Sequence, residues 1–280
     1  MKNDEIRAFF ESDDYCRPDE SEAISKEEEY VCAMYQIQGQ RDNQEDALGI
    51  FHSGEGILAA VCDGMGGLNG GEKASRTALE ILKEGILHKG SQEPLRFLMN
   101  EAQKIDRIVS GLLDQNGKRL NAGTTMVAAW IERRQMSFIT VGDSRIYLMR
   151  GKRLIQLTED QNYGMLLKRK LQSEEINRAE FQRESAMAEA LVNYIGIGGL
   201  QMIGCNSGGP LCLMPGDKIL LCSDGLYKSM TPERIAEHLI DCTAGSVERT
   251  LIRMVDEAEK NALRRRKKQD NTSVILVMEL

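Results

Sequence analysis

The chain has 280 residues, of which 41% are hydrophobic and 28% are charged. This composition is typical of a folded globular protein and excludes a fibre or a wholly disordered chain. The first 30 residues hold eleven acidic and four basic side chains, which account for the whole net charge of −7, so the remaining chain is electrically balanced. A balanced body offers no broad positive surface for nucleic acid, and no apolar run reaches the roughly 20 residues that span a bilayer. We therefore expect neither a nucleic-acid partner nor a membrane.

The N-terminal sequence and the cysteines indicate a cytoplasmic protein. The segment MKNDEIRAFF has no basic start followed by a long apolar stretch, so it does not resemble a secretory signal. The seven cysteines form an odd number without a CxxC pair, and Cys62 and Cys222 lie inside apolar runs. Free cysteine in such runs behaves as a small core residue, which is typical of a reducing compartment.

The chain divides into an acidic tail and one domain. Residues 1–29 are polar and acidic, which predicts a solvated tail, although Ile6, Phe9 and Phe10 also fit a short amphipathic turn that docks on the body. From Tyr30 onward, apolar runs bounded by Gly and Asp continue without a linker or an internal repeat. We therefore predict a single domain over residues 30–280.

Apolar runs of moderate length predict strands, and apolar residues at spacings of three and four predict helices. The expected strands are YVCAMYQI, DALGIF, GILAAVC, TTMVAAWI, QMSFITV, RIYLMR, KILLC and TSVILVM. The expected helices begin near Gly70, cover about residues 93–113, begin at Thr231 with Pro232 in the first turn, and begin at Ser246.

Short polar turns connect several of these strands, as in ERRQ at 132–135 and RGKR at 150–153. Such turns favour hairpins, and hairpins build antiparallel sheet. Helices follow the third strand and precede the last one. This order predicts an α+β layered sandwich.

Five aspartates lie where apolar strands begin or end: Asp46, Asp63, Asp143, Asp224 and Asp270. A single aspartate at a strand end is usually a turn residue. If the sheet ends bring several together, their repulsion requires compensation, and Mg²⁺ and Mn²⁺ prefer carboxylate, carbonyl and water oxygens. The three histidines do not stand at zinc-ligand spacing from other histidines or cysteines, so the sequence allows an oxygen-ligand metal centre.

Six motifs in order resemble the metal-dependent (PPM-type) Ser/Thr protein phosphatase family, and DGMGG resembles its bacterial branch. They cover about residues 33–278: GQRDNQEDALGIF, VCDGMGGLNGGEKAS, NAGTTMVAAW, ITVGDSRIYLMRGKRLIQLTEDQ, LLCSDGLYK and QDNTSVILV. The resemblance implies a four-layer α-β-β-α sandwich with two central antiparallel sheets. It also implies a hydrolase in which water activated by two Mn²⁺ or Mg²⁺ ions attacks a phosphomonoester.

The resemblance implies a role for each residue that matches a functional position of the family. Asp63 resembles the carboxylate that bridges two metal ions, Gly64 would contribute its carbonyl, and Asp224 and Asp270 would complete the shell of the second ion. Glu45 and Asp46 would act mainly through metal-bound waters. Arg41, whose forked donors suit phosphate oxygens, resembles the substrate-binding arginine. Asp143 resembles a ligand of a third, weaker metal.

Some positions depart from the family pattern or lie outside it. Lys228 stands where an acid commonly helps to hold the third metal, so we expect that ion to bind weakly or not at all, unless Lys228 points to solvent. No histidine occurs in the motifs, and Met65 occupies the place of a proposed proton donor, so no general acid is assigned. The charged segment 162–191 falls where the family has a flap near the cleft, although a solvated surface helix explains it equally well. The basic run 264–268 predicts a solvated helix end or, alternatively, a docking surface for acidic segments.

The expected activity is therefore dephosphorylation of phosphoserine or phosphothreonine proteins, the products or targets of a Ser/Thr kinase. Two alternatives remain open: a non-catalytic regulator that binds phosphoproteins, and a hydrolase of small phosphoesters. The sequence specifies no oligomeric state.

Overall fold

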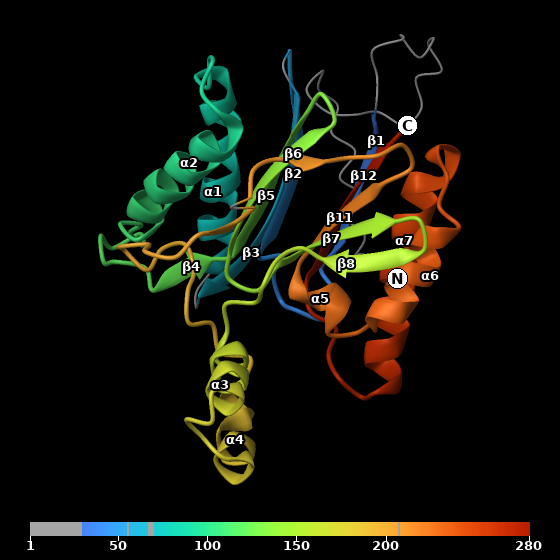
Figure 1. The fold of residues 1–280 in the computed structure, drawn as a ribbon. Coiled ribbons are helices and arrows are strands. Elements are labelled where there is room, and N and C mark those ends of the chain that lie inside the picture. Colours follow the sequence, from blue (N-terminus) through green and yellow to red (C-terminus); the bar gives the residue numbers. More distant parts are fainter. Residues whose placement is uncertain (1–29, 55, 67–69, 207) are drawn as a thin grey trace.

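Four layers, in the order helices, sheet, sheet, helices, make up the described part of the chain (Figure 1). The computed structural model describes residues 30–54, 56–66, 70–206 and 208–280. The predicted acidic tail, residues 1–29, lies outside the described residues. No helix in the described ranges is both long and apolar enough to cross a membrane.

Both sheets are antiparallel, as the hairpin turns predicted. One has the strand order β1 (Tyr30–Ile37), β12 (Thr272–Glu279), β11 (Lys218–Cys222), β7 (Arg145–Arg150), β8 (Arg153–Gln156). The other has the order β10 (Leu211–Cys212), β6 (Gln135–Val141), β5 (Met126–Glu132), β3 (Gly56–Gly66), β2 (Asp46–Ser53), with β4 (Ala122–Thr124) on β3 and β9 (Gly204–Cys205) on β6.

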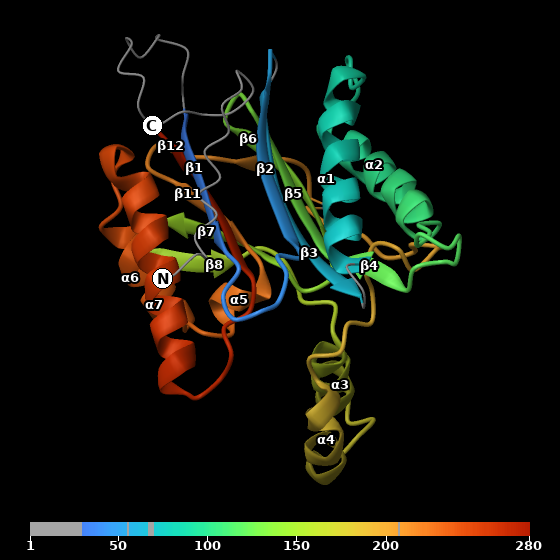
Figure 2. The ribbon, with the colours of Figure 1, turned by 180° about the vertical axis from the view of Figure 1, so that it is seen from behind.

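Helices cover the outer face of each sheet, as the view from behind also shows (Figure 2). Helices α1 (Gly70–Leu87) and α2 (Pro94–Val109) cover the β2–β10 sheet, and α6 (Pro232–Ile240) and α7 (Val247–Arg264) cover the β1–β8 sheet. The short α5 (Asp224–Tyr227) follows β11, and η1 (Ser185–Met187) and η2 (Ala244–Ser246) are 3₁₀ turns. Helices α3 (Tyr163–Gln172) and α4 (Arg178–Glu184) project from the end of the sandwich.

The core consists of three apolar layers, because every sheet is buried on both faces. Leu220 and Cys222 of β11 pack toward α6 and α7, whereas Ile219 and Leu221 pack between the two sheets. Trp130 lies in the third layer, beneath α1 and α2. Burial on both faces explains why the strands appear in the sequence as continuous apolar runs and not as alternating patterns.

The observed elements confirm the α+β four-layer prediction, with differences in some element bounds. The predicted strand TTMVAAWI is divided at Thr125, so that Thr124 ends β4 and Met126 begins β5. Strand β3 continues past Cys62 to Gly66, because β4 pairs with its extension. Asp63 therefore lies inside the strand, opposite Asp46 on β2, and not at the strand's end as predicted. Helix α2 ends at Val109, earlier than predicted, and is capped by Ser110.

Candidate active site

A pocket of about 450 Å³ lies at one end of the sandwich, where segments from both sheets meet. The sheets bring together residues that are far apart in sequence, because the ends of β3, β6 and β11 and the start of β12 all open toward it. The predicted site residues that line it are Arg41, Glu45, Asp63, Gly64, Asp143, Asp224, Lys228 and Asp270. Asp46 is buried and does not line the pocket.

Asp46 and Asp63 form a pair of carboxylates on neighbouring strands. Asp46 is 4% exposed, and its Oδ2 accepts a hydrogen bond of 2.8 Å from the Ser223 hydroxyl. Its Oδ1 has no hydrogen-bond partner among the described residues. Burial, followed by the charges of Asp224 and Asp270, raises the pKa of Asp46 to about 7 despite its hydroxyl donors.

The main chain at Asp63 and Gly64 is held from two sides. The Asp63 amide donates to the Thr125 hydroxyl at 3.0 Å, and the Gly64 amide donates to the Glu45 carbonyl at 3.1 Å. A Cβ atom on Gly64 would stand 2.2 Å from the carbonyl oxygen of Gly71. Only glycine permits this close approach between β3 and the first turn of α1.

Two cationic side chains already pair with acids of the pocket. Arg41 Nη2 lies 2.5 Å from Asp270 Oδ2, and Lys228 Nζ lies 2.6 Å from Asp224 Oδ2. Lys228 also lies 3.2 Å from Glu189 Oε2. The alternative that Lys228 points to solvent is therefore not what the structure shows.

Asp143 is held by a packed group of side chains next to it. Tyr227 donates its hydroxyl to the Asp143 carbonyl at 3.0 Å, and the Arg145 guanidinium lies over the Tyr227 ring. Arg145 also donates two hydrogen bonds to the Asp160 carboxylate, at 2.8 and 2.7 Å. Burial and then the charge of Asp224 raise the pKa of Asp143 to about 6.

The pocket concentrates negative charge in a poorly solvated place. Burial, followed by the charge of Asp46, raises the pKa of Asp63 well above its usual value. Burial also raises the pKa of Asp224, although Lys228 opposes that shift, and burial raises the pKa of Glu45. Carboxylates that are crowded and buried in this way bind cations favourably, because a cation offsets their mutual repulsion.

The donor chemistry of these residues fits Mg²⁺ or Mn²⁺. The pocket offers carboxylate and carbonyl oxygens, and none of the three histidines lines it. As the side chains stand, no group of three or more Asp, Glu, His or Cys in the described ranges is arranged to hold a metal ion. Arg41 and Lys228 hold two of the acids in their present positions, so metal binding requires these ion pairs to rearrange.

The pocket also contains residues that the sequence analysis did not single out. Asn271 accepts from the Glu45 amide at 2.8 Å and donates to the Gln38 and Asn43 carbonyls, which ties the segment around Arg41 to β12. Asn271 could have been identified from the sequence, because it directly follows Asp270 in the last motif. Tyr194 also lines the pocket, but no motif marks it.

The sequence left two interpretations open for segment 162–191 and for the basic run 264–268, and the structure decides only the first. Segment 162–191 forms α3 and α4, and its residues Glu189 and Leu191 line the pocket, so it is more than a solvated helix. The basic run 264–268 begins at the last residue of α7, and Arg265 contacts the Lys228 carbonyl at 3.4 Å. No described contact tests whether the run docks an acidic segment.

Known proteins with similar sequences are bacterial phosphatases. The chain is 31% identical over 213 residues to "Serine/threonine phosphatase stp" of Listeria welshimeri, a match that covers 71% of this chain and 78% of the relative. It is 28% identical over 244 residues to "Protein phosphatase PhpP" of Streptococcus pneumoniae, covering 81% and 92%.

Solved structures share the fold. A serine/threonine phosphatase of S. agalactiae superposes with a TM-score of 0.76 at 22% identity, covering 90% of this chain and 100% of that one. The catalytic domain of PstP in complex with two manganese ions gives a TM-score of 0.70 at 23% identity, covering 89% and 97%. The family model described as "Protein phosphatase 2C" matches residues 36–265. The chain therefore belongs to the protein phosphatase 2C family.

Proposed function

We propose that this protein is a metal-dependent Ser/Thr protein phosphatase that hydrolyses phosphomonoesters of phosphoserine and phosphothreonine. The observation that carries the proposal is the convergence of Arg41, Asp63, Asp224 and Asp270, from four separate motifs, on one pocket. The names of the relatives, serine/threonine phosphatase and protein phosphatase, support the same activity.

Asp63, the Gly64 carbonyl, Asp224 and Asp270 would hold two Mn²⁺ or Mg²⁺ ions, as the manganese complex of PstP suggests by analogy. When bound, such a pair lowers the pKa of a shared water and offsets charge on the phosphoryl oxygens. Glu45, which lines the pocket, and Asp46, which is buried opposite Asp63, would act mainly through waters bound to the ions.

Arg41 would bind the substrate phosphate. Its side chain is 55% exposed, so the guanidinium can leave Asp270 and turn toward a phosphate without losing a buried partner. Its fork of donors matches two phosphoryl oxygens. No histidine lines the pocket among the described residues, so we assign no side chain as general acid, and a water would supply the proton to the leaving oxygen.

We expect two metal ions and not three. The Lys228 ammonium already compensates charge between Asp224 and Asp143, where a third cation would be repelled. Asp143 would then act mainly in shaping the pocket, as a weak metal ligand at most.

The test compares the wild-type protein with Asp224→Asn and with the matched control Asp42→Asn, which changes an exposed acid beside Arg41. Hydrolysis of p-nitrophenyl phosphate and of a phosphothreonine peptide is measured with Mn²⁺, and Mn²⁺ binding is measured by calorimetry. We expect Asp224→Asn to lose both activity and Mn²⁺ affinity by at least about a hundredfold, and Asp42→Asn to retain both.

The outcomes separate the alternatives. A wild-type protein that binds phosphopeptide but hydrolyses neither substrate would be a non-catalytic regulator. Hydrolysis of the small ester alone would favour a small-phosphoester hydrolase. Full activity in Asp224→Asn would refute the assignment of this pocket.

The proposal extends to the substrates of the protein and to its division into domains. The substrates would be phosphoproteins made by a Ser/Thr kinase, and residues 30–280 would form the catalytic domain with residues 1–29 as an acidic tail. Deleting residues 1–29 should leave hydrolysis of p-nitrophenyl phosphate within about twofold of wild type. A larger change would show that the tail regulates the site.

A further inference from the structure

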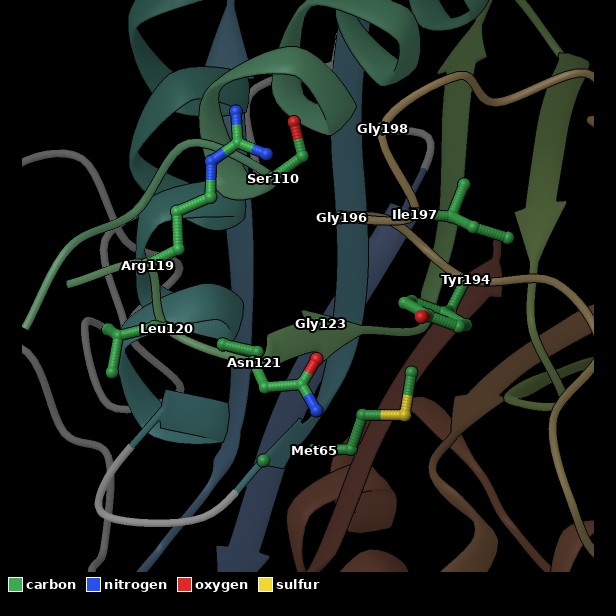
Figure 3. A pocket seen from close by; sticks show the side chains of 12 residues that line it. Met65, Ser110, Arg119, Leu120, Asn121, Gly123, Tyr194, Gly196, Ile197 and Gly198 are labelled. Atoms are coloured by element: carbon green, nitrogen blue, oxygen red, sulfur yellow. The ribbon is translucent and has the colours of Figure 1, made fainter.

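A second pocket, of about 570 Å³, adjoins the acidic one (Figure 3). It lies between the end of α2, the segment that leads into β4 and the segment 194–198. Met65, Gly66 and Tyr194 line both pockets, so the two pockets lie side by side. A chain bound with one residue over the aspartates would extend into the second pocket.

The two pockets differ in charge. No acidic side chain lines the second pocket among the described residues, and Arg119 places its guanidinium there, on the same side as Ser110 (Figure 3). Arg119 is exposed, and its side chain has neither an ion pair nor a hydrogen bond within the described part of the chain. In the first pocket, by contrast, Arg41 and Lys228 already pair with carboxylates.

The wall of the second pocket is held in place before any ligand binds. Asp106 of α2 is 1% exposed, and its carboxylate accepts the backbone amides of Gly196, Gly198, Gly199 and Leu200 at 2.8–3.2 Å. The Tyr194 ring lies against the backbone of Gly123, where an added Cβ would stand 2.6 Å from the ring. A fixed wall reduces the ordering that binding requires.

We propose that this second pocket binds the part of a phosphoprotein substrate next to the phosphorylated residue, and that Arg119 selects a carboxylate there. The inference rests on the proposed phosphatase function. Arg119 offers an acidic residue near the phosphorylated one a cation in the adjoining pocket, with no partner among the described residues. Because an extended chain advances about 3.3 Å per residue and the two pockets adjoin, the test places the acid about two to four residues from the phosphorylated one.

The test uses the full chain and three substrates: p-nitrophenyl phosphate, a phosphothreonine peptide with neutral flanks, and peptides with glutamates two to four residues before or after the phosphothreonine. Arg119→Gln is compared with wild type, with Arg119→Lys, and with Arg153→Gln. The last variant removes the same charge from an exposed position on β8 in the other sheet. kcat and KM are measured separately for each substrate.

We expect wild type to prefer the peptide with glutamates on one side by about fivefold in kcat/KM, mainly through KM, as for a partly exposed charged hydrogen bond. Arg119→Gln should lose this preference and keep its rate on p-nitrophenyl phosphate. Arg119→Lys should keep part of the preference, and Arg153→Gln all of it.

Three results would overturn the proposal while leaving the phosphatase function intact. The first is an equal kcat/KM of wild type on acidic and neutral peptides. The second is a preference for acidic peptides that Arg119→Gln retains. The third is a rate on acidic peptides that is higher for Arg119→Gln than for wild type. The last result would point to the protein's own acidic segment as the occupant of the pocket. If wild type hydrolyses none of the substrates, the failure lies in the proposed function itself.

Discussion

Asp106 gives a prediction whose size follows from the structure. Its carboxylate is the common acceptor of four backbone amides in the loop 196–200, and the donor–acceptor distances lie between 2.8 and 3.2 Å. Asp106→Ala removes all four bonds. Because Gly198 and Gly199 are exposed, water can replace part of what is lost. At about 0.5–1 kcal/mol for each bond, the free energy of unfolding should fall by about 2–4 kcal/mol.

The assay is thermal and urea unfolding of wild type, Asp106→Ala and Asp114→Ala. Asp114 is a matched control, since it also accepts two backbone amides, from Asn116 and Lys118, but in an exposed turn. We expect Tm to fall by about 5–10 °C for Asp106→Ala, and the free energy of unfolding to fall by at most about half as much for Asp114→Ala, which removes two bonds in place of four. Equal stability of the two variants would refute the reasoning.

The same residue predicts a pH dependence. Burial raises the pKa of Asp106, but the four amide donors outweigh it and hold the pKa below its usual value. A lowered native pKa means that the stabilisation is present above the unfolded pKa of about 4 and is lost as the pH falls through the native value. The stability gap between wild type and Asp106→Ala should therefore be constant from pH 7 to 5 and shrink below pH 4. A gap that does not change with pH would show that the charge contributes nothing.

Three further predictions concern the acidic pocket. Lys228→Met removes the ammonium that competes for Asp224, so calorimetry should show Mn²⁺ binding tightened by about tenfold; unchanged affinity would contradict this. The raised pKa values of Asp46 (about 7) and Asp143 (about 6) mean that the metal-free protein loses stability as the pH rises from about 4 to 7. Mn²⁺ should therefore raise Tm more at pH 7.5 than at pH 5, and an equal rise would count against the shifts. Arg145→Lys breaks a bidentate pair and a stacked contact, and should lower the free energy of unfolding by about 1–3 kcal/mol in urea; a loss below about 0.5 kcal/mol would contradict it.

The sequence alone predicted most of the strands and helices and the residue types of the first pocket. Long apolar runs such as QMSFITV and KILLC predicted strands with correct ends, because a strand buried on both faces leaves an uninterrupted run between polar turns. The motif acids were identifiable from their recurrence at strand ends and from the family resemblance, because a single such aspartate is usually a turn residue. Four of the five aspartates, Asp63, Asp143, Asp224 and Asp270, meet in one pocket, although Asp63 lies inside β3 and Asp46 is buried outside the pocket lining. Their metal-binding roles remain predictions.

Only the tertiary structure decided how charges and loops are paired across the chain. Lys228 reaches Glu189 in the segment 162–191, and Asp106 holds a loop some ninety residues later in the sequence. The second pocket with Arg119 arises where α2, β4 and segment 194–198 meet. None of these contacts follows from local pattern, because hydrophobic periodicity specifies which face of an element is buried but not which polar side chain from another element lies opposite it. Packing of the two sheets fixes those partners, and the site depends on them.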